Sequence, residues 1–477
     1  MKKLTIAIGI LLTWCSIGFG ANFGSKMLNR QPSAGLYINA HSVGAAWNEG
    51  NSSPALTRTG AVPAKTGVSP GNALLPVQSK MKRTVFTDAG EVNYYLCGTD
   101  STTKADCSTA SDLTGTDGQI MVEIPVFWIA YGYSGTTHRW KTANEALPGF
   151  ERHPAFYKAG AWVANRYIGA YEAWTDGSTK LASVSGQLPT VSQTISTFRT
   201  RAEARGTGWH QMDWYLYNAV ILLYLTEYAD LNVQATLGAG VTDYEVWPGG
   251  PQALTGNSNS IGNAIGNLTL AVDKWNASTA YTLNNECIPD ASQNGYTYRV
   301  TVAGTSGGGE PTWPTTLGNT VVDGAVTWEC VRHAGYNSYR GVENWFGHIW
   351  KFIDGVNIHN SSANGSRLYT AQDYTAFASD TDTGYLLITS DLAQLDGFEK
   401  TMVPTAHGFV PKTVGGSSST YVSDYHYTYY DNNPDSGWRV LRVGGSAVSG
   451  LNAGPFFLLS NDGSSNVSSS IGGRLAY

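Results

Sequence analysis

Charged residues are scarce in this sequence. Only 14% of its 477 residues are Asp, Glu, Lys or Arg, and the net charge is −6. A protein that binds DNA or RNA through phosphates needs a surplus of basic residues. Here 30 Lys and Arg stand against 36 Asp and Glu, so the sequence predicts no nucleic-acid partner.

Cysteine is also rare, with five in the chain. Cys97 and Cys107 are close enough to close a small loop, and Cys287 and Cys330 bracket one segment. Neither pair has the CxxC or Cys/His spacing of a zinc site, and the nine histidines show no HExxH motif. We therefore expect no metal and no cofactor. Each cysteine pair is either a disulfide or two buried thiols.

Only one long apolar run is present, LTIAIGILLTWCSIGFGA, directly after Lys2 and Lys3. It is slightly short for a transmembrane helix, and no second apolar span follows. The segment 1–20 has the composition of a signal peptide. It is therefore either an export signal or an apolar segment buried in an assembly.

Glycine, aromatic and small polar residues are abundant instead. The chain has 55 Gly, 27 Tyr and 15 Trp, with Ser, Thr and Asn filling much of the rest. This mixture favours short strands, tight turns and a surface that binds through rings and small polar groups. It does not favour a helical bundle. The predicted fold class is α+β with a large share of strand.

Two helices are expected within this strand-rich pattern. The first runs from about Thr194 to Arg205, and Gly206 follows to end it. The second spans residues 211–229, where apolar residues recur three and four apart. That spacing predicts a single stripe of side chains facing the core.

The residue pattern changes between residues 273 and 332. This segment alternates apolar and polar residues between Gly, Pro and Asp turns, as a small all-β module does. Because a mixed helix-and-strand pattern resumes at Tyr339, we interpret the module as an insertion whose ends lie close together. Trp275 and Tyr281 either stack on sugar rings or belong to the module's core, and Trp328 is expected in the core.

Two stretches, YRGVENWFGHIWKFIDGVNI and GWRVLRVGGSAVSGLNAGPFFLL, carry a family resemblance. With weaker matches such as SSPALTRTG and HPAFYKAG, the chain resembles phage tail and tail-fibre proteins with a C-type lectin fold. These proteins are related to the formylglycine-generating enzyme superfamily and to proteins varied by diversity-generating retroelements. The resemblance implies a C-type-lectin-like domain from residues 114–272 plus 333–477, preceded by a β-rich attachment region over residues 21–113.

The function implied by the resemblance is non-catalytic receptor binding. We expect a homotrimer in the virion, at a phage tail tip or fibre, that contacts other tail proteins and attaches to a glycan or protein receptor on a bacterial surface. The oxidase members of the superfamily use paired cysteines near the C-terminus, and no Cys follows Cys330 here. His407 and His426 are isolated, so no catalytic residue is predicted. The alternatives are an exported lectin-like, carbohydrate-binding adhesin of the cell surface and a structural tail or baseplate protein.

The resemblance places ligand contacts on the final strands and loops. The matching positions are Tyr427, Tyr429, Tyr430, Asn432, Asn452, Asn461, Asp462, Ser464, Ser465, Asn466 and Ser468. Tyr, Asn and Ser supply rigid contact area and adaptable hydrogen bonds. Replacing Asn461, Asp462, Ser464 and Asn466 by Ala is expected to weaken binding and leave stability nearly unchanged. Trp345 and Trp350 are expected in the core.

Overall fold

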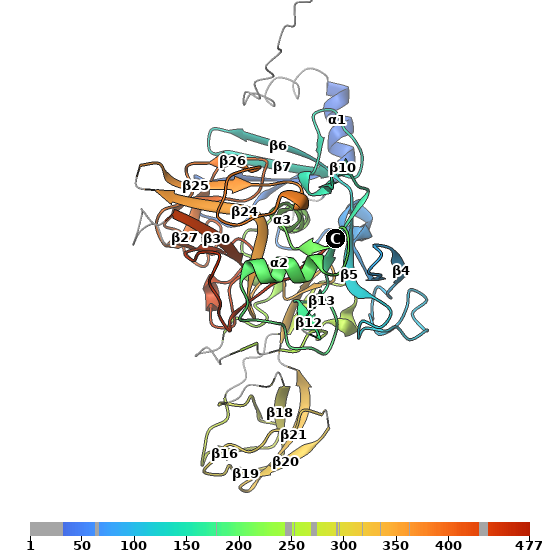
Figure 1. Cartoon of the computed structure of the whole chain (residues 1–477), viewed down its shortest axis with the longest axis vertical. Helices are drawn as coiled ribbons and strands as arrows, with labels where there is room; N and C mark the ends of the chain where they lie inside the picture. The colour runs from blue at the N-terminus through green and yellow to red at the C-terminus, as the bar shows by residue number, and fades with distance from the viewer. Residues whose placement is uncertain are drawn as a thin grey trace, which may run out of the picture.

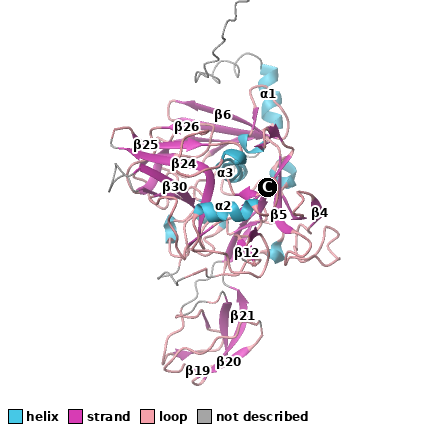
Figure 2. Cartoon of the chain, viewed as in Figure 1, coloured by secondary structure: helices cyan, strands magenta, loops and turns pink. Residues whose placement is uncertain are grey.

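Short strands joined by tight turns make up most of the chain, with few helices (Figure 2). β-branched and aromatic residues favour strands, and glycines allow the turns between them. This mixture agrees with the expected α+β class. The computed structural model describes residues 32–62, 66–177, 179–243, 250–251, 253–268, 274–291, 294, 296–316, 318–333, 335–361, 363–428 and 437–477.

Both expected helices are present, each slightly shorter than predicted. Helix α2 spans Ile195–Glu203, and the Thr194 side chain caps it by accepting a hydrogen bond from the Thr197 amide. Helix α3 spans Trp214–Tyr228 and begins after Asp213, whose carboxylate accepts from the Leu216 amide at 2.9 Å. The other helices are α1 (Pro32–His41), α4 (Val233–Leu237) and the 3-10 turns η1 (Asn72–Leu74), η2 (Gln78–Lys80), η3 (Pro154–Phe156), η4 (Asn259–Ile261), η5 (Tyr374–Ala376) and η6 (Gly450–Asn452).

The single apolar stripe predicted for the second helix is wrong. Every residue of α3 is buried, because strands from both halves of the chain pack around it. A helix that is apolar on all sides lies in the middle of a core, not on its surface. Figure 1 shows α3 at the centre of the main body, so it is the element around which the sheets are arranged.

Two sheets contain most of the N-terminal strands. The five-stranded sheet has the order β2 (Thr57–Gly60), β1 (Val43–Asn48), β7 (Thr137–Ala143), β6 (Trp128–Ser134), β8 (Glu151–Arg152). The six-stranded sheet has the order β14 (His210–Gln211), β33 (Leu475–Ala476), β11 (Asn165–Gly169), β5 (Gln119–Pro125), β3 (Lys82–Phe86), β4 (Val92–Tyr95). Strand β33 at the far end of the chain thus lies inside a sheet of N-terminal strands.

The nine-stranded sheet is built from the C-terminal third. Its order is β26 (Leu386–Thr389), β25 (Gly365–Thr370), β24 (Trp350–Ser361), β30 (Gly437–Val443), β31 (Leu458–Ser460), β29 (Tyr425–Thr428), β27 (Gly397–Met402), β28 (Pro411–Val414), and β32 (Ile471–Gly472) pairs with β24. Smaller sheets are β15 (Gly266–Leu268), β22 (Tyr336–Tyr339) and β23 (Val342–Glu343); β9 (Tyr157–Lys158) with β10 (Ala161–Trp162); and β12 (Trp174–Asp176) with β13 (Lys180–Ala182).

Residues from before and after the inserted module share one hydrophobic core. The largest cluster joins Trp47 and Ile124 to α3, and α3 to Trp345 and Leu441. Strand β1 pairs with β7, and β3 pairs with β5. Residues 43–113 therefore do not form a core of their own, and the boundary expected at residue 113 does not separate two packed units.

The module has a separate core and lies at one end of the molecule (Figure 1). Its strands are β16 (Ala280–Tyr281) with β19 (Gly304–Thr305), and the four-stranded sheet β17 (Glu286–Cys287), β18 (Tyr296–Val302), β21 (Val326–His333), β20 (Thr320–Asp323). Leu268 in β15 pairs with Tyr336 in β22. The two chain segments that lead into and out of the module are therefore hydrogen-bonded neighbours.

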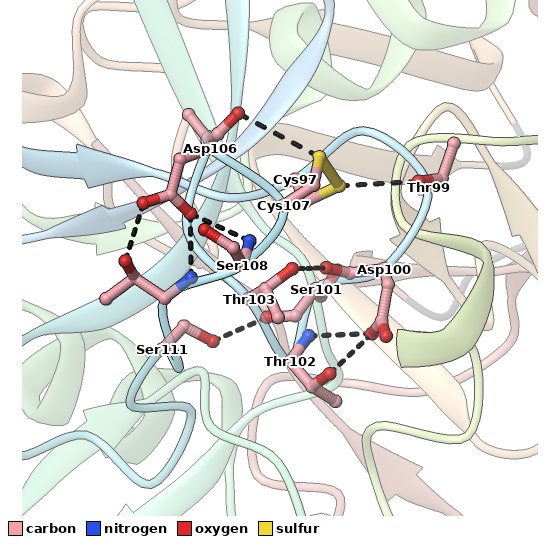
Figure 3. Close-up of a disulfide and its surroundings, with 12 residues drawn as sticks. Cys97, Thr99, Asp100, Ser101, Thr102, Thr103, Asp106, Cys107, Ser108 and Ser111 are labelled. Carbon is pink, nitrogen blue, oxygen red and sulfur yellow. Dashed lines mark hydrogen bonds between the residues drawn. A yellow bond between two sulfur atoms is a disulfide. The ribbon is translucent and has the colours of Figure 1, made fainter.

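The two cysteine pairs have different outcomes. Cys97 and Cys107 form a disulfide, and the loop between them is held by side-chain hydrogen bonds (Figure 3). Cys287 and Cys330 are buried free thiols, because both lie opposite Tyr298, on either side of it. One intervening strand puts their Cα atoms about 9–10 Å apart, beyond the reach of a disulfide.

Within the described ranges, no helix has both the length and the apolar character that crossing a bilayer requires. The apolar segment 1–20 lies outside the described residues.

Candidate ligand-binding surface

Three neighbouring strands of the nine-stranded sheet carry the predicted ligand surface. Tyr427 in β29 lies opposite Leu459 in β31, which lies opposite Arg442 in β30. Paired residues project from the same face of a sheet, so these side chains form a row. Tyr427 is 37% exposed, whereas Leu459 and Arg442 are buried. We call this row, with residues 461–470 that follow β31, the C-terminal surface.

Arg442 fixes the start of the loop 461–470. Its guanidinium donates to the Asn461 side-chain oxygen at 2.6 Å and forms an ion pair with Asp462. The same guanidinium lies 5.9 Å from the Trp350 ring centre. Burial lowers the pKa of Arg442 to about 10, against the opposing effect of the Asp462 carboxylate. Arg442 remains charged at neutral pH, and Asp462 is its counter-ion.

The rest of the loop is tied down at two further points. The Ser464 hydroxyl donates to the Asp380 carboxylate. The Ser468 carbonyl accepts from the Ser192 amide at 2.9 Å, and its hydroxyl is 2.9 Å from that of Ser470. These contacts give a loop without regular secondary structure a defined position on the sheet.

Between these points the loop presents side chains to solvent. Ser465 is exposed, and Val467 is 53% exposed. The Asn466 amide donates to the Gly463 carbonyl at 3.1 Å, while its side-chain oxygen is buried and accepts no hydrogen bond from the described residues. The side chains free to meet a ligand are thus Ser465, Val467 and Tyr427.

A row of aromatic rings follows the strands that carry this surface. Phe398 packs edge-on against Tyr425 at 5.3 Å, Tyr425 against Phe457 at 5.7 Å, and Phe457 against Trp350 at 4.6 Å. Phe457 and Trp350 are buried, and Tyr425 is half-buried. Burial and the Asp396 carboxylate raise the pKa of Tyr425. These rings form a stiff base, and Trp350 belongs to the core as expected.

The structure corrects the expected stability of this loop. The sequence predicts that replacing Asp462 changes stability little, as at an ordinary surface position. Its partner Arg442 is only 6% exposed, so loss of Asp462 would leave a buried charge without its counter-ion. Asp462 and Asn461 therefore position the loop. Sequence reasoning missed Arg442 and Asp380, although the alternation in WRVLRV places Arg442 on the same face as Val440.

The remaining predicted contacts do not all join this surface. Asn452 belongs to η6, where the Gln234 side chain donates to the carbonyls of Gly450 and Ala453, and the Gly450 amide donates to the Thr242 carbonyl. That turn is packed on α4. Tyr429, Tyr430 and Asn432 lie outside the described residues.

Of the two module rings proposed for sugar stacking, Trp275 belongs to the module's core and Tyr281 is half-buried against it. Trp275 is only 6% exposed, and its indole donates to the Asp323 carboxylate at 2.7 Å. Trp328 donates to the same carboxylate at 3.1 Å. Tyr281 packs edge-on against Trp328 at 4.7 Å. A module of about sixty residues needs these rings for its own stability, so the stacking alternative is wrong for Trp275.

One cluster of buried ionisable groups elsewhere is paired inside the core. His348 and Lys351 both contact the Glu172 carboxylate, Lys351 at 2.7 Å, and all three are buried. Burial alone would raise the pKa of Glu172, but these two neighbours outweigh it and hold the value at about 2. Burial lowers the pKa of Lys351 to about 8. His426 is also buried, with a ring nitrogen 3.1 Å from the Ala393 carbonyl.

No group of three or more His, Cys, Asp or Glu side chains is placed to hold a metal ion in the part of the chain that the structure describes. Comparison with models of known protein families and with curated proteins gives no match.

Proposed function

We propose that this chain is a non-catalytic binding protein that attaches a phage tail to a bacterial surface receptor through the C-terminal surface. The observation that carries the proposal is the loop 461–470, anchored by Arg442 and Asp380 while Ser465, Val467 and Tyr427 remain exposed. A stiff scaffold that presents short polar and aromatic side chains lowers the entropy cost of binding.

The finer fold assignment belongs to the same proposal. We propose that residues 114–272 and 333–477 form a C-type-lectin-like domain. Support comes from the two helices α2 and α3, the shared core on both sides of the module, and the pairing of β11 with β33. The proposed assembly is a homotrimer at the tail tip or fibre, which light scattering after size-exclusion chromatography measures directly.

An exported lectin-like adhesin is the second candidate, and one observation favours it. The Cys97–Cys107 disulfide forms most readily in an oxidising compartment, and Cys107 is exposed. Immunogold labelling separates the two candidates: label on phage tails supports attachment by a virion, and label on the envelope of phage-free cells supports an adhesin.

The binding test uses fluorescently labelled full-length protein and a panel of bacterial strains, scored by flow cytometry. We expect Tyr427→Ala and Ser465→Arg each to reduce binding at least tenfold, because one removes exposed ring area and the other places bulk on the loop. Each tenfold loss corresponds to about 1.4 kcal/mol. Neither change should alter the melting temperature, because both side chains are exposed.

The matched control is Tyr37→Ala, a 50% exposed tyrosine on α1. It should bind cells as the unmodified protein does. Unchanged binding by both Tyr427→Ala and Ser465→Arg would show that the ligand surface lies elsewhere. Failure of the unmodified protein to bind any strain would count against receptor attachment itself.

A further inference from the structure

Aromatic and charged side chains also meet at the edge of the five-stranded sheet. Arg152 in β8 lies opposite Trp128 in β6, and Trp162 in β10 lies opposite Tyr157 in β9. The guanidinium carbon of Arg152 is 5.6 Å from the centre of each indole ring. The Arg152 side chain thus connects the β6–β8 pair with the β9–β10 pair. Neither pair belongs to the sheet that carries the C-terminal surface.

Trp162 is unusual in its exposure. It is 47% exposed, and no other tryptophan that the structure describes is as accessible to solvent. Leaving so large an apolar ring in water has a free-energy cost. The ring is nevertheless held in place, since Tyr157 packs edge-on against it at 5.4 Å and Arg152 lies near its face. A held, exposed ring is the arrangement that a stacking ligand requires.

Polar groups lie beside the ring in an open hollow. The hollow has a volume of about 470 Å³ and is lined by Glu151, Arg152 and Trp162. Glu151 and Arg152 are both exposed, at adjacent positions of β8. A carboxylate accepts hydrogen bonds and a guanidinium donates them, so the residues that line the hollow offer both an acceptor and donors to the hydroxyl groups of a ligand. Because the hollow is open to solvent, a ligand bound there would lie against Trp162 with its other face exposed.

We propose that this hollow binds a neutral pyranose sugar, with one face of the ring stacked on Trp162 and its hydroxyls bound by Glu151 and Arg152. The proposal does not rest on the function of the C-terminal surface. A neutral sugar fits because the charges of Glu151 and Arg152 offset each other at adjacent positions. A membrane surface is less suited, because Glu151 would be repelled by anionic lipid headgroups.

The test applies the full-length protein to an array of bacterial polysaccharides and neutral oligosaccharides. Any glycan that binds is then titrated while the fluorescence of the tryptophans is followed. We expect Trp162→Ala to weaken this binding at least tenfold, and Glu151→Gln, which keeps the side-chain shape, to weaken it severalfold. Tyr37→Ala is the control, because that exposed ring on α1 belongs to neither surface and its loss should leave glycan binding unchanged.

Thermal melts establish that each variant is folded, and Glu151→Gln provides a second readout with little change of volume. The proposal is overturned if no glycan on the array binds, or if Trp162→Ala binds as tightly as the unmodified protein. Trp162-dependent sedimentation with phosphatidylcholine–phosphatidylglycerol vesicles, without glycan binding, would assign the hollow to a membrane and also overturn it. If Tyr427→Ala loses cell binding but keeps glycan binding, while Trp162→Ala loses glycan binding but keeps cell binding, the two surfaces act independently.

Discussion

At the scale of single residues, the C-terminal surface depends on one buried cation. Arg442 is held between Asp462, Asn461 and the Trp350 ring, so the loop above it follows the position of the guanidinium. The polar residues of this loop therefore divide into two groups. Asn461, Asp462 and Ser464 hold the loop, and Ser465 faces solvent.

Replacing Asp462 by Ala should lower the free energy of unfolding by about 1–3 kcal/mol, because a buried charged group loses its partner. Ser465→Ala in the same loop is the control and should stay within about 0.5 kcal/mol, because that side chain is exposed. Urea denaturation followed by tryptophan fluorescence measures both. Equal midpoints for the two variants would show that the ion pair does not hold the loop.

Trp345 tests the packing of the main core. It is 1% exposed and stacks on Tyr339 with ring centres 5.3 Å apart. Trp345→Ala should cost about 3–5 kcal/mol, because the cavity it leaves cannot fully collapse. The readout is the shift in the urea midpoint. Trp162→Ala is the control, since that ring is exposed and should cost far less.

At the scale of elements, two buried acidic residues lie close together in the strands that carry the C-terminal surface. Glu399 in β27 and Asp424, next to β29, are both buried, and the Glu399 amide donates to the Asp424 carbonyl at 2.9 Å. The Asp424 carboxylate accepts from the Phe456 amide at 2.8 Å, whereas one Glu399 oxygen has no hydrogen-bond partner in the described residues. Burial and the nearby Asp424 raise the pKa of Glu399, and burial raises that of Asp424.

This pair predicts a loss of stability at high pH. A carboxyl whose folded pKa is raised binds its proton more tightly in the folded state. The carboxyl's contribution to the stability of the fold is fully present at pH values below its pKa in the unfolded chain, about 4. That contribution is lost as the pH rises through its pKa in the folded protein. Glu399→Gln should therefore melt at a higher temperature than the unmodified protein at pH 8–9, and the difference should shrink towards pH 5.

Melting temperatures measured from pH 5 to 9 give the result. Glu151→Gln is the control for the same chemical change at an exposed position, where substitution should alter the melting temperature little. If the melting temperatures of Glu399→Gln and the unmodified protein differ by the same amount at every pH, the expected dependence of stability on the protonation of Glu399 is contradicted.

Much of the element pattern is predictable from local sequence. The pattern predicts helices over residues 194–205 and 211–229, and the structure has Ile195–Glu203 and Trp214–Tyr228. Capping groups and periodicity are local, so the sequence carries them. Which sides of α3 are buried depends on strands far away in the chain, and for that reason the predicted stripe is wrong.

The candidate site is less predictable for the same reason. The resemblance over the C-terminal stretch makes Tyr427 and residues within 461–468 candidates, and their role in binding stays a prediction. The pairing of Asp462 with Arg442 and of Ser464 with Asp380 depends on tertiary structure. The sequence does not decide between core and surface for Trp275, because a ring in a short β module gives the same pattern whether it is buried or exposed.

At the scale of the whole molecule, the module is the part most separable from the rest. Its core contains only its own residues, and Leu268 and Tyr336 at its base are paired strand neighbours. Replacing residues 273–333 by a short Gly-Ser linker should leave the main body with one cooperative melting transition, because insertions joined at neighbouring ends are tolerated. Calorimetry of the deletion variant measures this, and loss of the cooperative transition would show that the module supports the main core.

The place of β33 has a consequence for how the protein is made. The backbone of Tyr477 exchanges hydrogen bonds with Tyr167, and its carbonyl also accepts from Arg166, 311 positions away in the chain. The six-stranded sheet therefore cannot close while residues 475–477 are still inside the ribosome. Until β33 is synthesised, the place between β14 and β11 in the sheet is empty. A chain that stalls before this point exposes the unpaired edges of these two strands to chaperones or proteases.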